Sequence, residues 1–194
     1  MVFMKNVDKW RTIMKIKGKG RSVCLLLLIC IGILSMTGCS MGMGRETLET
    51  DVLRVGMHLD IDKMCYLSQE DNQPEGFEVE LAGLLADKMG MELEIVDTTE
   101  ENLLKSLDGE VYDCVLSSVG LSQWNTIHYG HTQPYLDLSS IEKGSGDEED
   151  TRIAAFMKKG NSLADTLEEN LEELKEDGTL SQLSSKYFGE DLTI

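Results

Sequence analysis

Hydrophobic and polar positions follow two different periods along residues 52–118. The runs VLRVGM (52–57), ELEIV (92–96) and YDCVLSS (112–118) are short and are either largely apolar or alternating. In GFEVELAGLLADKMG (76–90) the apolar residues instead recur at helical spacing, and Gly90 suits the end of a helix. The pattern therefore predicts three strands and, between the first two, a helix over 76–90.

A second helix is expected between the last two of these strands. Thr98 and Glu101 have the spacing of a capping box, which predicts a helix that continues through Leu107. The resulting β-α-β-α-β order is typical of a parallel, doubly wound sheet. We therefore expect an α/β fold.

The C-terminal part, residues 151–190, has its own strand and helix pattern and is called the C-terminal block here. RIAAFMKKG (152–160) predicts a strand, Ser162 with Asp165 predicts a helix start, and Asp177-Gly178 predicts its end. Thr179 with Gln182 predicts the start of a further helix. The apolar stripes of these two helices consist of Leu163, Leu167, Leu171 and Leu174, then Leu180, Leu183 and Tyr187. The block has too little core to fold alone, so we expect it to pack on the first block across a polar linker at 139–150.

The N-terminus has the pattern of an export signal. A basic segment at Lys15–Arg21 precedes an apolar run of twelve residues at Val23–Leu34, too short to span a bilayer comfortably. Met36-Thr37-Gly38-Cys39 follows and resembles the bacterial lipobox, which predicts cleavage before Cys39 and attachment of lipid to its thiol. A plain membrane anchor with an incidental cysteine is the alternative. Translation could begin at Met1, Met4 or Met14.

These signals divide the chain into a signal peptide (1–38), a flexible tether (39–51) and one lobe (52–190) in which 139–150 is a linker. A diacylglycerol on Cys39 supplies two acyl chains, enough for stable anchoring. The expected location is the outer, extracytoplasmic face of the cell membrane.

Charge and cysteine content narrow the functional classes. The chain has 18 basic and 35 acidic residues, and seven of the basic ones lie in residues 1–38. The rest of the chain is so acidic that it repels nucleic acid, which excludes nucleic acid as a partner. The acidic surface either serves only to keep the protein solvated or attracts a cationic ligand, and both interpretations stay open. Cys114 lies within an apolar, strand-like run and is expected as a core residue, with a disulfide between Cys65 and Cys114 as the alternative. No spacing of Cys or His indicates a metal site, and we expect no cofactor.

The order of these segments resembles a known family. LRVGM, GFEVELAGLLADKMG, ELEIVDTTEENLLKSLDGEVYDCVLSSVG, Pro134-Tyr135 and finally RIAAFMKKGNSLADTLEENLEELKEDGTLSQLSSKYFGE resemble the solute-binding proteins of polar-amino-acid ABC importers. The resemblance covers most of 52–138 and 151–190. It implies a periplasmic-binding-protein-like fold and an ABC permease as partner. In that family a whole second lobe lies where this chain has only 139–150, so the resemblance implies a single lobe with the second lobe absent.

The resemblance also places the ligand site. By position, the arginine that clamps the amino-acid carboxylate falls on Asn125, the threonine near the amino group on Gly120, and the glycine before it on Ser118. The acidic residue after the first strand falls on His58, and the two aromatic walls fall on Ile61 and Glu100. Most of these positions lose the needed chemistry, so we expect a degenerate site that does not bind free α-amino acids tightly.

Three functional hypotheses remain open. The first is a solute-binding-type lipoprotein of an amino-acid importer, truncated and with a degenerate site. The second is a lipoprotein that binds a protein partner, or a second copy of itself, through the lobe face that the missing lobe would cover. The third, an enzyme on the same fold, is disfavoured because only Asp60 and Glu100 are candidates, and only by location.

Overall fold

The computed structural model describes residues 46–141 and 151–194. The expected signal peptide at 1–38, the lipidation site Cys39 and most of the 139–150 linker lie outside these residues. Within the described ranges, no helix is long and apolar enough to cross a membrane.

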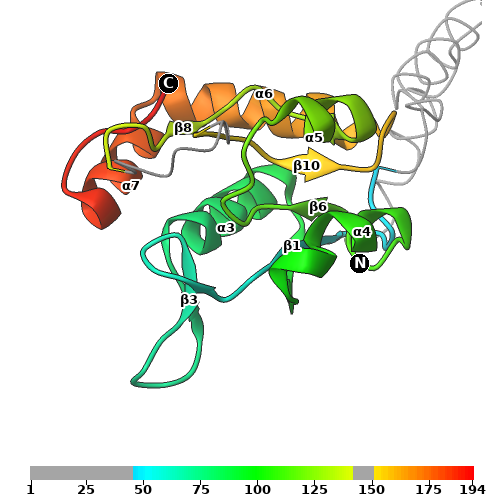
Figure 1. Cartoon of the computed structure of the whole chain (residues 1–194), viewed down its shortest axis with the longest axis horizontal. Coiled ribbons are helices and arrows are strands. Elements are labelled where there is room, and N and C mark those ends of the chain that lie inside the picture. Colours follow the sequence, from blue (N-terminus) through cyan, green and yellow to red (C-terminus); the bar gives the residue numbers. More distant parts are fainter. Residues whose placement is uncertain (1–45, 142–150) are drawn as a thin grey trace, which may run out of the picture. The chain divides into compact units, whose positions relative to one another are not determined.

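A central sheet of five strands organises the lobe (Figure 1). Its order is β5 (Glu92–Asp97), β1 (Val52–Met57), β6 (Cys114–Val115), β10 (Phe156–Met157) and β7 (Gly130–His131). Strand β1 runs parallel to both β5 and β6, whereas β10 is antiparallel to both of its neighbours. The expected α/β lobe with a mostly parallel sheet is confirmed.

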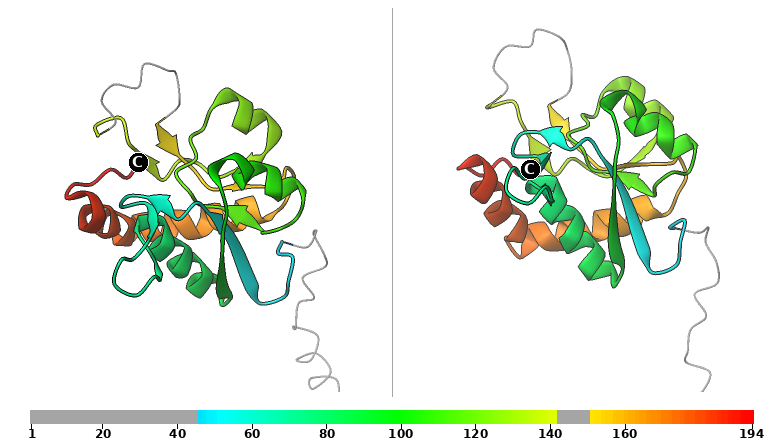
Figure 2. Two further views of the ribbon diagram at one scale, coloured as in Figure 1. Left: turned by 60° about the horizontal axis from the view of Figure 1, so that its bottom comes forward. Right: turned by 90° about the horizontal axis from the view of Figure 1, so that it is seen from below.

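Helices cover both faces of this sheet (Figures 1 and 2). The larger core lies on the face covered by α3 (Phe77–Met89), α6 (Leu163–Glu176) and α7 (Thr179–Phe188). The smaller core lies under α4 (Leu103–Asp108), on the face that also buries Tyr112 and Phe156. Alternate residues of β1 (Leu53, Val55 and Met57) are fully buried in the larger core, as the period of a strand requires.

Two of the expected strands are shorter than their apolar runs. In 112–118 the strand itself covers only Cys114 and Val115, although the N–H of Asp113 also donates to the carbonyl of Arg54 on β1 at 3.0 Å. The run 152–160 divides into β9 (Arg152–Ile153) and β10, and only β10 joins the central sheet. Strand β9 instead pairs with β8 (Leu136–Asp137).

The expected helix caps are wrong in detail. Thr98 does not cap a helix: its N–H donates to the carbonyl of Met57, and a short 3-10 turn (Glu100–Asn102) precedes α4. Helices α6 and α7 begin where predicted, but neither Ser162 nor Thr179 supplies the cap. Asn161 accepts the N–H of Leu163 at 3.0 Å, and Asp177 accepts that of Thr179 at 2.9 Å. In both helices the capping side chain lies two residues before the first helical position.

Two other parts of the lobe carried no predicted element. Residues 60–75 form a small antiparallel sheet, with strands β2 (Asp60–Ile61), β3 (Cys65–Leu67) and β4 (Pro74–Glu75). Figure 1 shows the loop beyond β3 extending away from the central sheet. The short helix α5 (Gln123–His128) follows β6 and is capped by Ser122, whose side chain accepts the N–H of Asn125.

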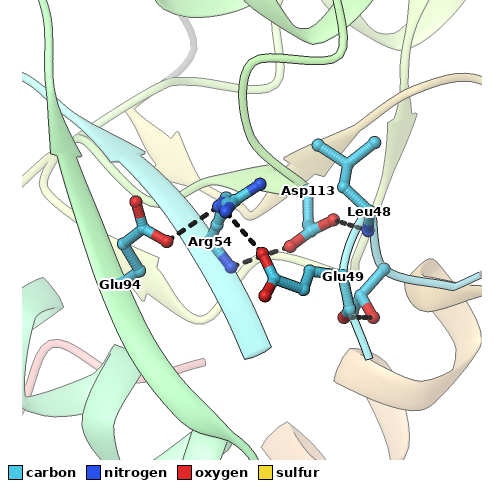
Figure 3. A network of polar contacts seen from close by, with 6 residues as sticks. Leu48, Glu49, Arg54, Glu94 and Asp113 are labelled. Atoms are coloured by element: carbon cyan, nitrogen blue, oxygen red, sulfur yellow. Dashed lines mark hydrogen bonds and ion pairs between the residues drawn. The ribbon is translucent and has the colours of Figure 1, made fainter. Parts of the chain in front are cut away.

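The first described residues are fixed to the amino end of β1 (Figure 3). Asp113, which is 4% exposed, accepts the N–H of Leu48 at 2.5 Å with one carboxylate oxygen and that of Arg54 at 2.7 Å with the other. The guanidinium of Arg54 pairs with Glu49 at 2.7 Å and Glu94 at 2.8 Å. The last part of the expected tether is therefore bound to the lobe from residue 46 onward.

Candidate functional site

A cleft opens at the carboxyl ends of the parallel strands, where α/β sheets bind ligands. His58 follows β1, Glu100 follows β5, and the 117–120 segment follows β6. The cavity measures about 580 Å³. All six residues that the sequence singled out line it: His58, Ile61, Glu100, Ser118, Gly120 and Asn125. The structure brings together the positions that family resemblance had assigned to one site.

Hydrogen bonds fix His58 at the floor of the cleft. Its backbone N–H donates to Ser117 Oγ at 2.8 Å, and its Nδ1 lies 3.0 Å from the carbonyl oxygen of Thr98. A carbonyl oxygen only accepts, so Nδ1 donates this hydrogen bond. An imidazole at this place offers an ammonium group a weaker partner than the carboxylate that the family resemblance implies here.

Asn125, which the family resemblance sets at the position of the carboxylate-clamping arginine, makes a hydrogen bond within its own segment. Its Nδ2 donates to the carbonyl of Gly120 at 2.9 Å, across the turn that begins α5. An uncharged amide cannot supply the paired N–H groups and the charge of a guanidinium. Among the described residues that line the cleft, Lys105 is the single lysine or arginine.

The two positions that the family resemblance assigns to aromatic walls carry Ile61 and Glu100. Ile61 is half-buried in β2, and Glu100 is exposed at the start of the 3-10 turn, where it lies beside Glu101. Trp124 supplies an aromatic surface that family position did not predict. Its indole is 57% exposed, lines the cleft and stacks on His128 with ring centroids 4.1 Å apart.

A buried carboxylate, Glu78, lies directly behind the cleft and was missed at the sequence level. It is fully buried in the first turn of α3, and both of its carboxylate oxygens accept the N–H of Ser118 at 2.8 Å. Tyr135 donates its hydroxyl to the same carboxylate at 2.6 Å. Desolvation outweighs these hydrogen bonds and raises the pKa of Glu78 to about 7.

The two cysteines behave as core residues. Cys65 and Cys114 are both buried and both free, so the alternative of a disulfide is not realised. Burial raises the pKa of each thiol well above its usual range, which disfavours the reactive thiolate. Within the described ranges, no group of three or more His, Cys, Asp or Glu side chains could hold a metal ion.

Comparison with known proteins identifies the family. Residues 53–190 match the model of the bacterial extracellular solute-binding proteins, family 3. The chain belongs to this family. The membership expected from the sequence is thereby confirmed, and it covers both the first block and the returning C-terminal block.

Individual relatives agree with this family. The L-cystine-binding protein TcyJ of Escherichia coli K12 is 29% identical over 120 residues, which are 62% of this chain and 40% of the relative. A cyclohexadienyl dehydratase of Pseudomonas aeruginosa is 27% identical over 111 residues, 56% of this chain and 41% of that enzyme. The chain thus spans about 40% of the length of the curated relatives that it matches.

A solved structure matches the single lobe. Domain 1 of TmArgBP in its arginine-bound form superposes with a TM-score of 0.56 at 27% identity. The match covers 64% of this chain and 94% of that domain. The likeness is therefore to one lobe of an arginine-binding protein.

Proposed function

We propose that this chain is a membrane-anchored, solute-binding-type lipoprotein related to amino-acid ABC importers, whose single lobe has a degenerate amino-acid site. Family membership supports the solute-binding class and an ABC permease as partner. The observation that carries the proposal is Asn125, whose amide is bonded to Gly120 where the family resemblance implies an arginine.

The loss of the arginine has a calculable effect on binding. A hydrogen bond to a charged group contributes about 1.5–3 kcal/mol, and a guanidinium makes two of them to a carboxylate. Replacing the acidic residue near the amino group by His58 removes a further charged partner. Together these losses amount to about 4.5–9 kcal/mol, which is more than half of a micromolar affinity of about 8 kcal/mol. We therefore propose no α-amino-acid binding tighter than about millimolar, roughly 4 kcal/mol.

Absence of a second lobe does not by itself rule out ligand binding. Only residues 139–150 lie where relatives of this family would carry a second lobe. Yet domain 1 of TmArgBP was solved in an arginine-bound form, so one lobe of a relative can hold its ligand. Degeneracy of this cleft therefore rests on the residues that line it.

Calorimetry on the 40–194 segment tests the degenerate site. With L-arginine and L-cystine as probes, we expect no isotherm tighter than about millimolar. Asn125→Arg restores a forked donor and should tighten binding of an α-carboxylate by about tenfold or more. Gln123→Arg is the matched control, because Gln123 lies on the same helix and does not line the cleft. A stoichiometric micromolar isotherm with the unaltered segment would overturn the proposal.

Lipid anchoring is the second component of the proposal. The order of a basic segment, an apolar run and Thr-Gly-Cys in residues 15–39 supports lipid anchoring. A lipid on Cys39 would hold the lobe at the extracytoplasmic face of the membrane. Cys39→Ala should abolish incorporation of labelled palmitate and release protein from the membrane fraction. Cys30→Ala, within the apolar run, is the matched control and should leave both unchanged. Equal labelling of the Cys39→Ala variant would refute lipidation at this residue.

One observation favours the alternative of an interaction module. Trp124 and Ile127 lie on the same short helix α5 and are 57% and 54% exposed, the highest values among the large apolar side chains of the described residues. A protein partner, or a second copy of the chain, would cover them. Light scattering of the 40–194 segment distinguishes a monomer from a homodimer, and loss of the dimer in Trp124→Ala would assign this face to it.

A further inference from the structure

Among the described residues, Glu78 is the only carboxylate with no exposed surface, and its side-chain hydrogen bonds lead to the cleft and to the segment before β8. Glu78 lies on α3, Ser118 follows β6, and Tyr135 precedes β8. The two hydrogen-bond donors thus come from positions 40 and 57 residues away in the chain. A charged side chain with no exposed surface is costly unless it has an essential partner.

Its partner Ser118 holds an unusual backbone conformation. The φ of Ser118 is +54°, in the left-handed region that non-glycine residues rarely adopt. Ser118 stands where the family resemblance implies a glycine, so the serine makes this turn less favourable by itself. The Glu78 carboxylate receives the N–H of this residue with both oxygens and thereby stabilises the turn that forms the cleft floor.

We propose that Glu78 is a positioning residue of the cleft: its ionised carboxylate fixes the backbone at Ser118, and protonation of that carboxylate loosens the cleft floor. A hydrogen bond to an ionised acceptor is roughly twice as strong as one to a neutral group. The protonated acid also turns one of its two oxygens into a donor, which no longer attracts the Ser118 N–H. Any effect on solute affinity rests on the proposed solute-binding function.

The surroundings of Glu78 make it the group that titrates. The titratable side chains that face it are Tyr135 and, on β3, Cys65, with Cys114 of β6 beyond Tyr135. Burial raises the pKa of all three above their usual values, so they stay protonated at neutral pH. The pKa of Glu78 itself lies at about 7. The half-buried carboxylate of Glu80, two residues on, pairs instead with Lys186 and Tyr187.

The backbone amide of Ser118 reports directly on this contact. In the full chain held in detergent micelles, its ¹⁵N–¹H resonance should titrate between about pH 5 and about pH 9 with a midpoint at about 7. Glu78→Gln should abolish the titration of the Ser118 resonance. Glu80→Gln, the matched control on the same helix turn, should leave it unchanged. Tyr135→Phe removes one donor to the carboxylate and should move the midpoint to higher pH.

The outcomes separate this inference from the proposed function. A Ser118 resonance that stays constant with pH in the unaltered chain, or that still titrates in Glu78→Gln, overturns the positioning role. If Glu78→Gln does not fold, the upward shift in Tyr135→Phe decides, and an unchanged midpoint there contradicts the inference. No solute is needed for any of these measurements, so amino-acid binding detected by calorimetry would refute degeneracy of the site without affecting the role of Glu78.

Discussion

The buried carboxylate of Glu78 predicts a specific pH dependence of stability. Its pKa rises from an ordinary value of 4.5 to about 7 on folding, chiefly because burial disfavours the charged form. The folded state therefore binds this proton more tightly than the unfolded state does. The stability that the group contributes is fully present below pH 4.5 and is lost as the pH rises through about 7.

The magnitude follows from the two pKa values. At about 1.4 kcal/mol per pH unit, the difference between 4.5 and about 7 amounts to about 3 kcal/mol of unfolding free energy. Urea unfolding of the 40–194 segment at a series of pH values measures it, as the difference between the unaltered segment and Glu78→Gln. Subtraction removes the contributions of the other acidic residues, which both proteins share. The difference should fall by about 3 kcal/mol between pH 4.5 and pH 8.

Glu80→Gln provides a control of opposite sign. Partial burial works against ionisation of Glu80, but Lys186 and Tyr187 outweigh it and lower the pKa of this carboxyl. Its contribution is therefore present above its unfolded pKa and is lost as the pH falls through the folded value. If the Glu78→Gln difference is independent of pH, or grows as pH rises, the assignment of a neutral-range pKa to Glu78 is wrong.

Two further predictions concern packing of the lobe. Gly56→Ala should lower the unfolding free energy by about 1–3 kcal/mol, because a methyl group at this position of β1 would overlap the buried ring of Tyr112. The control is Gly83→Ala in α3, where an added methyl group meets no neighbouring atom within 4 Å. In urea unfolding this variant should be neutral or more stable by up to about 1 kcal/mol. Deleting 151–190 removes β9, β10, α6 and α7, and with them a large part of the core. Thermal unfolding followed by circular dichroism should then show no cooperative transition. A sharp transition in the shortened chain would show instead that the first block folds alone.

The sequence predicted the long elements and missed the short ones for a physical reason. Helices α3, α6 and α7 and strands β1 and β5 each span enough residues for the period of their apolar positions to be evident. Strands of two residues, such as β2, β4 and β8, have no measurable period. Their pairing depends on tertiary neighbours that a local pattern does not contain.

The sequence predicted that the six cleft residues lie together, but it did not predict the buried carboxylate of Glu78 behind them. The six positions converge because the segments that carry them all follow the carboxyl ends of the parallel strands: His58 and Ile61 come after β1, Glu100 comes after β5, and Ser118, Gly120 and Asn125 come after β6. Glu78 was counted only as part of a helix, because an acidic residue in the first turn is ordinarily solvated and favourable there. Its burial depends on Ser118 and Tyr135, which become its neighbours only in the folded lobe.

The pairing of β8 with β9 explains how one lobe can close without a second. Leu136 faces Ile153 and Asp137 faces Arg152, and the N–H of Leu138 donates to the carbonyl of Thr151 at 3.0 Å. These two strands stand where, by the family resemblance, the chain leaves for the second lobe and returns. Because their hydrogen bonds are made to each other, both strand ends are satisfied within the lobe. The buried Leu136 and Ile153 remain in the larger core. Loss of the second lobe would therefore expose the cleft while leaving the core of this lobe complete.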